Sequence, residues 1–157
     1  MTSPLQIYTA YQQRLRARDY EHLNEVADVK GYTENCLGLT GWTTGLEVAL
    51  QNYARNILAA FSDVVYETED AIESADALAI RSRAEGIHTG TFLGVPATGR
   101  RIAWDIVALV HTRDGRVIGQ WIQPDLWSIY QQLTSAVAGI PQTLSANPPL
   151  GWPRSAN

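Results

Sequence analysis

The chain has 157 residues and a mass of 17.3 kDa, which fits one domain with a single buried core. Its formal net charge is −4, and its twelve cationic residues are scattered, so the sequence lacks the clustered cations of a nucleic-acid-binding face. One cysteine excludes an internal disulfide, and three dispersed histidines give no zinc-ligand spacing. No secretion signal and no apolar run of about 18 residues is present, so we expect no membrane contact and a cytoplasmic location.

The first part of the chain has helical periodicity. Residues 4–17 place apolar side chains at helical spacing after a Ser-Pro start. Asp19 can cap a short second helix over residues 20–27. A third helix with a broad apolar stripe is predicted over residues 44–60.

From residue 63 the period of the apolar residues falls to two, which is typical of strands. A last helix follows at residues 126–133. Helices followed by a run of antiparallel strands predict an α+β domain, in which helices cover one face of a curved sheet and leave a cone with an open internal pocket. The predicted strands are residues 63–72, 77–92, 101–112 and 116–123.

The domain is predicted to occupy residues 1–135, followed by a Pro-rich tail over residues 136–157. The tail lacks periodicity, so we expect an extended segment. Leu150 and Trp152 are unfavourable residues to leave in water, which favours a tail that wraps the domain or a partner.

The hairpin formed by the last two strands allows two registers. A two-residue loop would pair Arg113 with Arg116, whereas a three-residue loop with Gly115 in the left-handed conformation would pair Thr112 with Arg116. A one-residue slip moves every side chain to the other face. The three-residue loop gathers the apolar side chains on one face, so we predict that loop. The predicted inner face consists of Ile102, Trp104, Ile106, Ala108, Val110, Ile118, Gln120, Ile122 and Pro124.

The same register places His111, Asp105, Val117 and Trp121 on the outer face of the sheet. We therefore interpret His111 as a surface or interface residue rather than a catalyst. Asp125 directly precedes the last helix, where a carboxylate that accepts backbone N–H bonds is a common N-cap.

Residues 86–121, GIHTGTFLGVPATGRRIAWDIVALVHTRDGRVIGQW, resemble the SnoaL-like polyketide cyclases of the nuclear-transport-factor-2-like superfamily. The helical opening and the closing Gln-Gln-Leu extend the resemblance over about residues 4–134. It implies the cone fold, a hydrophobic small-molecule substrate, no cofactor and no metal. It also implies a homodimer through the outer face, where Val107, Leu109 and Trp121 would lie.

The resemblance is less specific for the reaction, because this superfamily also contains isomerases, dehydratases and epoxide hydrolases. Aldol-type relatives carry an acid/base Asp directly after the hairpin Trp, whereas here Trp121 is followed by Ile122. The oxyanion-hole Asp of ketosteroid isomerases falls on Ala108. Aliphatic side chains transfer no protons, so the usual mechanism of these relatives does not carry over intact.

Two candidate catalytic residues come from the predicted inner face and the first helix. His88 falls on the apolar side of its strand, where it is either a general acid/base or a hydrogen-bonded core residue. Tyr11 precedes Asp19 by eight residues, the spacing at which the resemblance places an oxyanion-hole tyrosine. The alternative is that Tyr11 belongs to the core.

Further candidates lie in the stretch GYTENC and on the hairpin. Tyr32, Glu34 and Asn35 occupy the segment that carries a base or polar anchor in the isomerase and dehydratase relatives. The sequence does not choose between Glu34 and Asn35, and either could be a plain loop residue. Gln120 lies on the predicted inner face, and its amide can orient carbonyl and hydroxyl groups without titrating.

Aromatic and apolar side chains could form the walls of the pocket. Aromatic rings offer flat surfaces for a polycyclic or polyene ligand, although such residues can equally belong to the core. The predicted walls are Tyr32, Trp42, Tyr53, Phe92, Trp104, Ile106, Ala108 and Ile122.

The resemblance, taken with these residues, implies a cofactor-independent cyclase that acts on a polyketide-derived intermediate and closes a ring by aldol, conjugate-addition or cycloaddition chemistry. A pocket that holds the reacting carbons together and excludes water would supply most of the catalysis. Two alternatives remain open. One is a dehydratase or isomerase that uses His88 with Glu34, and the other is a noncatalytic ligand-binding protein.

Overall fold

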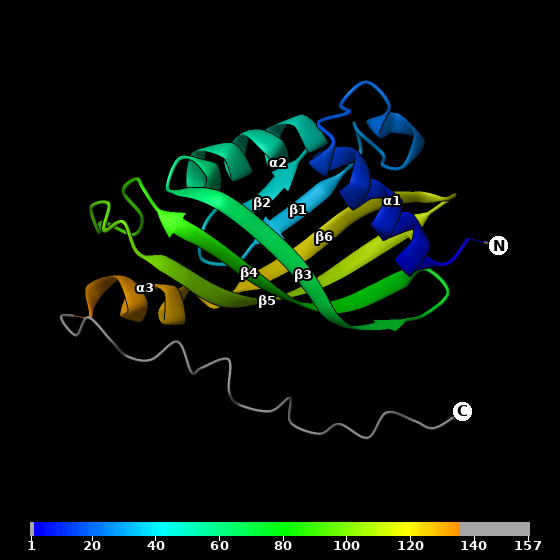
Figure 1. The fold of residues 1–157 in the computed structure, drawn as a ribbon. Helices are drawn as coiled ribbons and strands as arrows, with labels where there is room; N and C mark the ends of the chain where they lie inside the picture. Colours follow the sequence, from blue (N-terminus) through cyan, green and yellow to red (C-terminus); the bar gives the residue numbers. More distant parts are fainter. Residues whose placement is uncertain (1, 136–157) are drawn as a thin grey trace, which may run out of the picture.

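The computed structural model describes residues 2–135, in which three α-helices pack against a curved, unclosed sheet of six strands (Figure 1). Helix α1 (Pro4–Arg16) begins with a capping box, because Ser3 and Gln6 cap each other's backbone N–H groups. Ile7 and Tyr11 form its buried face. The predicted first helix is therefore confirmed. The tail prediction falls on residues 136–157, which lie outside the described residues.

The prediction of a helix over residues 20–27 is wrong. Only one 3-10 turn, η1 (Leu23–Glu25), forms there. The carboxylate of Asp19 is bound by Arg14 and His22 and is not available as a cap. The chain instead continues to an isolated parallel bridge between Ala27 and Val117.

Two short strands, β1 (Thr33–Cys36) and β2 (Gly41–Thr44), were not predicted. β1 pairs antiparallel with β2 and parallel with the last strand, so the sheet is mixed rather than purely antiparallel. Gly119 permits the parallel pairing, because a Cβ there would lie 2.3 Å from the carbonyl oxygen of Thr33.

The third predicted helix is present, but its last turn is π-helical rather than α-helical. Helix α2 (Leu46–Tyr53) continues as a π-helical turn, η2 (Ala54–Leu58). In that turn the backbone N–H of Ala59 donates to the carbonyl of Ala54 at 2.9 Å.

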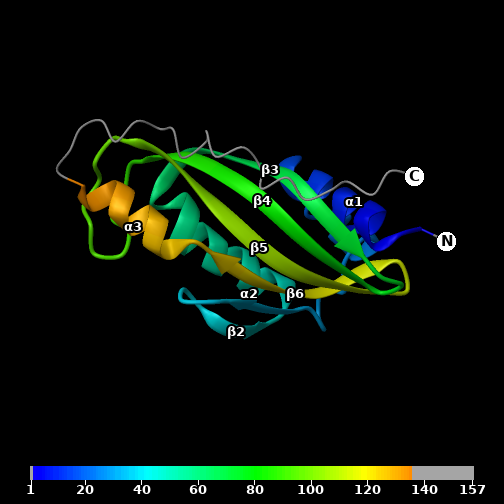
Figure 2. The same ribbon diagram turned by 90° about the horizontal axis from the view of Figure 1, so that it is seen from below.

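Four long strands follow: β3 (Phe61–Glu73), β4 (Ala77–His88), β5 (Arg101–Arg113) and β6 (Arg116–Pro124). They confirm the predicted strands, although β4 ends at His88 rather than at residue 92. The order across the sheet is β2-β1-β6-β5-β4-β3. We call the face toward α1 and α2 the inner face; the opposite one is the outer face. Figure 2 shows the long strands crossing the molecule, with α1 and α3 (Leu126–Thr134) near opposite ends.

The β5–β6 hairpin has the two-residue loop, so the prediction of a three-residue loop is wrong. Arg113 pairs with Arg116, and both loop residues have positive φ, as a type I′ turn requires. A bulge at Ile118 then adds one residue to β6 and restores the predicted parity from Gly119 onward. The bulge also reverses two predicted positions: Val117 is buried in the core, and Ile118 borders a surface pocket.

The predicted orientations of His111, Asp105 and Ile122 are confirmed, because the first two side chains are exposed and Ile122 packs against the core. Asp125 caps α3 as predicted, since its Oδ1 accepts the backbone N–H of Ser128 at 2.9 Å. Helix α3 seals the edge of β5 beyond the end of β6. Here the side-chain amide of Gln132 bonds to both the N–H and the C=O of Ala103.

The buried side chains form two clusters. The α1 cluster is built around Ile7, Tyr11, Tyr32, Leu78 and Val110. The α3 cluster lies toward the other end of the sheet and is built around Phe61, Phe92, Trp104, Ile129 and Leu133. The polar residues of interest lie beside one cluster or the other, so these clusters decide which side chains can act together.

His88 binds the loop between β4 and β5, at the end of the sheet near α3. Its Nδ1 accepts the backbone N–H of Thr98 at 3.2 Å, which assigns the ring proton of the neutral imidazole to Nε2. Arg100, two residues after Thr98, donates to the carbonyls of Gln132 and Ser135 at the end of α3. Residues 86–100 of the sequence thus join the sheet to the last helix.

This arrangement predicts acid sensitivity. His88 is fully buried, and desolvation lowers its pKa below the usual value of about 6.5. Below that value the unfolded chain binds a proton that the folded chain resists, so the free energy of unfolding should fall as pH decreases through the folded pKa. One such proton changes stability by at most about 1.4 kcal/mol per pH unit.

Chemical denaturation between pH 8 and about pH 5 tests this prediction. His88→Gln should be less stable at pH 8 and should lose less stability than the wild type on acidification. His111→Gln, at an exposed position, should keep the wild-type slope. An unchanged pH dependence in His88→Gln would contradict the assignment.

Candidate functional site

Glu34 of β1 is the centre of the candidate site. The parallel pairing places Glu34 beside Gln120 of β6, both on the inner face. The Gln120 amide donates to Oε2 of Glu34 at 2.8 Å, and the Tyr32 hydroxyl donates to the same oxygen at 3.1 Å. Only 8% of Glu34 is exposed. The structure therefore brings Gln120 of the hairpin together with Tyr32 and Glu34 of the stretch GYTENC.

The second carboxylate oxygen differs from the first. No residue of the described chain donates a hydrogen bond to Oε1 of Glu34, whereas Oε2 receives two. One oxygen is therefore held in place while the other keeps its lone pairs for a ligand. A fixed carboxylate with one unused oxygen can accept a proton from a bound molecule.

Two tyrosines of α1, Tyr8 and Tyr11, form a row of rings that ends at Tyr32. The ring centroids of Tyr8 and Tyr11 are 6.0 Å apart, and those of Tyr11 and Tyr32 are 6.4 Å apart. The Tyr8 hydroxyl accepts the side-chain amide of Gln12 at 2.8 Å, which leaves its own proton free to donate. Tyr11 is buried in the core, and its ring lies next to that of Tyr32, which binds Glu34.

The tyrosines remain protonated donors. Burial raises the pKa of Tyr8 to about 12, and the charge of Glu34 adds to the effect. Burial also raises the pKa values of Tyr11 and Tyr32. Neutral phenols next to a carboxylate can donate hydrogen bonds to an oxygen that becomes negative during a reaction.

The wall beside Glu34 is mainly apolar. Ala108 is buried, while Ile106 and Ile122 are half-buried on the same inner face. Cys36, two residues after Glu34, is half-buried too, and burial raises the pKa of its thiol to about 11. A neutral thiol is a weak nucleophile, so Cys36 contributes wall rather than covalent chemistry.

The register of β1 decides between Glu34 and Asn35 as the inward residue. Asn35 pairs with Trp42 on one side and Trp121 on the other, both on the outer face. The expectation that Trp42 lines the pocket is wrong, because 74% of this residue is exposed. Alternation along β1 and β2 turns Glu34 and Thr43 inward and their neighbours outward.

His88, Phe92 and Trp104 lie in or beside the α3 cluster, far from Glu34. Pairing across the sheet puts Glu34 level with Leu78 on β4. His88 is ten residues further along that strand, which corresponds to about 33 Å of extended chain. His88 and Glu34 are therefore not brought together around one small substrate.

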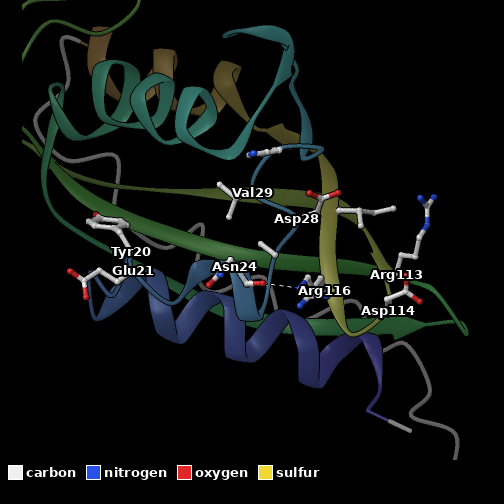
Figure 3. A pocket seen from close by; sticks show the side chains of 11 residues that line it. Tyr20, Glu21, Asn24, Asp28, Val29, Arg113, Asp114 and Arg116 are labelled. Carbon is white, nitrogen blue, oxygen red and sulfur yellow. Dashed lines mark hydrogen bonds between the residues drawn. The ribbon is translucent and has the colours of Figure 1, made fainter.

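A separate pocket of about 690 Å³ lies at the surface, between the β5–β6 hairpin and the segment after α1 (Figure 3). Tyr20 and Glu21 lie at one side, with Arg113 and Asp114 at the other. Arg116 donates to the carbonyl of Asn24 at 2.7 Å. The lining mixes three cationic residues with three acidic ones, and it contains none of the Glu34 site residues. This composition selects no charge class of ligand.

Sequence reasoning missed three residues of the interior: Tyr8, Cys36 and Tyr66. Tyr8 belongs to the same helical stripe as Tyr11. Cys36 follows Tyr32 and Glu34 at alternate positions, the period-two signal of a strand, although the segment is short. Tyr66 was included in a predicted strand but not assigned a face.

Within residues 2–135, no group of three or more His, Cys, Asp or Glu side chains is arranged to hold a metal ion. The same part of the chain has no helix that is long and apolar enough to cross a membrane.

Comparisons with known proteins agree with this architecture. Among solved structures, the chain is similar to IdmH from Streptomyces antibioticus, with 25% identity, a TM-score of 0.70 and coverage of 84% of this chain and 99% of that chain. It is also similar to a SnoaL-like polyketide cyclase from Agrobacterium tumefaciens (21% identity, TM-score 0.66, covering 85% and 99%). An NTF2-like protein from Burkholderia thailandensis shares the fold at 12% identity (TM-score 0.69, covering 86% and 100%).

No curated protein matches the chain. The family model described as SnoaL-like polyketide cyclase matches residues 5–133, which is most of the sequence. The chain belongs to the SnoaL-like polyketide cyclase family.

Proposed function

We propose that this protein is a cofactor-independent, cytoplasmic cyclase that closes a ring in a polyketide-derived intermediate of natural-product biosynthesis, with Glu34 as its base. The observation that carries the proposal is the Glu34 carboxylate, with Oε2 held by Tyr32 and Gln120 and Oε1 left unused. The family supports the substrate class. Glu34 also replaces, from a different strand, the hairpin carboxylates that this chain lacks at Ala108 and Ile122.

The first step is removal of a proton from the carbon next to a substrate carbonyl. Oε1 of Glu34 accepts this proton, and the electron pair of the C–H bond moves into an enolate. Protonated Tyr8 and Tyr11 donate hydrogen bonds to the enolate oxygen, and such a donor can lower a barrier by roughly 3 kcal/mol. Gln120 and Tyr32 keep the carboxylate oriented during the transfer.

The second step forms the ring. The enolate carbon attacks a second carbonyl or a conjugated alkene of the same molecule, which makes one carbon–carbon bond. The proton held by Glu34 then returns to the oxygen or carbon that has become negative. The apolar wall formed by Ile106, Ala108 and Ile122 excludes water and holds the chain folded, so that the two carbons meet.

Three alternative functions differ in how well they fit the structure. Cycloaddition would need the apolar wall but not Glu34. A dehydratase that combines His88 with Glu34 is disfavoured, because these residues lie about 33 Å of strand apart. A noncatalytic binding protein would use the same interior and leave its ligand unchanged.

Deletion of the gene in the source organism, followed by mass spectrometry, identifies the substrate. If the protein is a cyclase, its loss should cause an open-chain intermediate to accumulate. The purified protein should then convert this intermediate to an isomer of equal mass or to a product that lacks one water. Recovery of the intermediate unchanged from the purified protein would support the noncatalytic alternative instead.

Glu34→Gln tests the base with the accumulated intermediate as substrate. The amide keeps the size of the side chain but accepts no proton, so kcat should fall at least 100-fold, within the range typical of general bases. KM should change less than about threefold, because the contacts that bind substrate remain. Glu47→Gln, an exposed position on α2, is the matched control. A Glu34→Gln protein with near-normal kcat would exclude the proposed base and favour cycloaddition.

We also propose a homodimer through the outer face. One row of paired residues crosses the whole sheet there: Trp42, Asn35, Trp121, Leu109, Ala79 and Ile72. Four of these side chains are large, apolar and exposed, and Oδ1 of Asn35 is buried without a partner among the described residues. A mainly apolar row of this kind is typical of a surface that a second protein chain covers.

Trp121→Glu tests the dimer by placing a charge in the middle of this row. Light scattering after gel filtration at micromolar concentration should give a dimer for the wild type and a monomer for Trp121→Glu. Trp127→Glu, which changes an exposed tryptophan on α3, should remain dimeric. A monomeric wild type would rule out this interface.

A further inference from the structure

We propose that the exposed aromatic pair of α3, Trp127 and Tyr130, is a docking surface, and that its occupant is the Pro-rich segment 140–154 of the same chain. The surface comes from the described structure, and the segment is known from its sequence, because residues 136–157 lie outside the described residues. The docking does not depend on the proposed cyclisation chemistry. The match to the family model ends at residue 133, so the segment lies beyond the matched region.

Helix α3 presents two aromatic rings to the outside. Its inward face is formed by Ile129 and Leu133, which are buried in the α3 cluster. Trp127 and Tyr130 are three residues apart and lie side by side on another part of the helix surface. Their ring centroids are 6.0 Å apart with an interplanar angle of 23°, so the rings stack. Because 66% of Trp127 and 39% of Tyr130 are exposed, the stack is a flat aromatic surface open to a partner.

This pair has the chemistry that binds proline-rich segments. Such segments adopt the polyproline II conformation and dock on grooves lined by aromatic rings. Polyproline II makes no internal hydrogen bonds, so its carbonyls can accept from the indole N–H of Trp127 and the hydroxyl of Tyr130. Tryptophan and tyrosine also lose little conformational freedom when a ligand covers them. An extended peptide that contains proline is therefore the kind of partner that this surface fits.

The segment 140–154, IPQTLSANPPLGWPR, has the matching composition. It contains four prolines, and the adjacent pair Pro148 and Pro149 favours polyproline II. Leu150 and Trp152 add large apolar side chains, whereas the whole chain after α3 contains a single charged residue. A segment with so few charges and several large apolar side chains gains free energy when a surface covers it.

The surface of α3 is also the nearest one to this segment. Ser135 is five residues after Tyr130, which corresponds to about 7.5 Å along a helix axis. Arg100 donates to the carbonyls of Gln132 and Ser135 at 2.9 Å and 2.8 Å, which fixes the point where the chain leaves the helix. The five residues that follow can span up to about 17 Å when extended. This length is enough for the chain to turn back along α3 and reach Trp127.

The short connection makes a weak contact sufficient. A short flexible linker gives an effective concentration in the millimolar range. A contact with a Kd of only about 0.1 mM would then be occupied about ten times as often as it is empty. The outer-face row is further away, since its residue Leu109 lies about 20 Å along β5 from Ala103, which Gln132 binds. Closing the longer loop would cost more conformational entropy, so α3 is the favoured surface.

Fluorine NMR of the full chain tests the docking. With 5-fluorotryptophan incorporated, each of the five tryptophans gives its own signal, which single Trp→Phe substitutions assign. The Trp152 signal of the wild type should differ from that of the free labelled peptide 140–154. Trp127→Ala removes an exposed ring outside the core and should move the Trp152 signal to the free-peptide position. Trp42→Ala, at an exposed tryptophan of the outer face, is the matched control and should leave it in place.

Three results would overturn the inference. The first is a Trp152 signal that already lies at the free-peptide position in the wild type, or that Trp127→Ala leaves unchanged. The second is a signal that Trp42→Ala also moves, because the contact would then lie on the outer face or be unspecific. The third is a signal that approaches the free-peptide position on dilution, since docking within one chain is independent of protein concentration.

The unlabelled peptide 140–154 tests the same contact from the side of α3. The full-length variant Pro148→Ser/Pro149→Ser/Trp152→Ser should leave the surface empty, and the added peptide should then shift the Trp127 signal with a Kd of about 0.1 mM. A peptide of the same composition in scrambled order should bind at least about tenfold more weakly. Equal binding of both peptides, or no shift with either, would show that the aromatic pair is not a docking surface for this segment.

Discussion

The pairing of β1 parallel to β6 is the constraint on which the rest of the site depends. Gly119 lets the two backbones approach, since a Cβ would collide with Thr33. This register sets Glu34 beside Gln120 on the inner face. A shift by one residue would place the amide of Asn35 there and turn the carboxylate toward the outer face. Glu34 is the only buried carboxylate within residues 2–135, and its position thus follows from one short strand and one glycine.

The sequence predicted the long elements well, because periodicity is strongest over many residues. The four long strands, the first and last helices and the cap at Asp125 agree with their apolar patterns. The short strands β1 and β2 were not predicted from the sequence. β1 and β2 have four residues each, which is too few for a clear pattern. β1 is stabilised by pairing with distant β6, and β2 pairs in turn with β1. The helix expected after Asp19 does not form, because the neighbouring side chains of Arg14 and His22 occupy the carboxylate that would have capped it.

In the hairpin, the predicted faces are correct from Gly119 onward although the predicted loop length is wrong. The apolar pattern required even-numbered residues of β5 and β6 to share a face, and a three-residue loop was the simplest way to achieve it. The protein uses a two-residue turn and a bulge at Ile118 instead. Both solutions insert one residue, so the faces agree from Gly119 onward while Val117 and Ile118 exchange roles.

The sequence identified most residues of the candidate site, but it did not show which of them lie together. Tyr11, Tyr32, Glu34 and Gln120 were all identified from the sequence, yet their convergence depends on contacts between segments up to 86 residues apart. His88 shows the opposite case, because its strand parity correctly predicted burial. Its distance from Glu34 depends on how far along β4 it lies, and only the pairing across the sheet reveals that distance.

The most direct test of this account is a crystal structure of the protein with its accumulated pathway intermediate. The account predicts an intermediate inside the cone, with its acidic carbon within about 3.5 Å of Oε1 of Glu34. An intermediate bound instead in the surface pocket between Tyr20 and Arg116, or a Glu34 side chain turned away from the ligand, would contradict it.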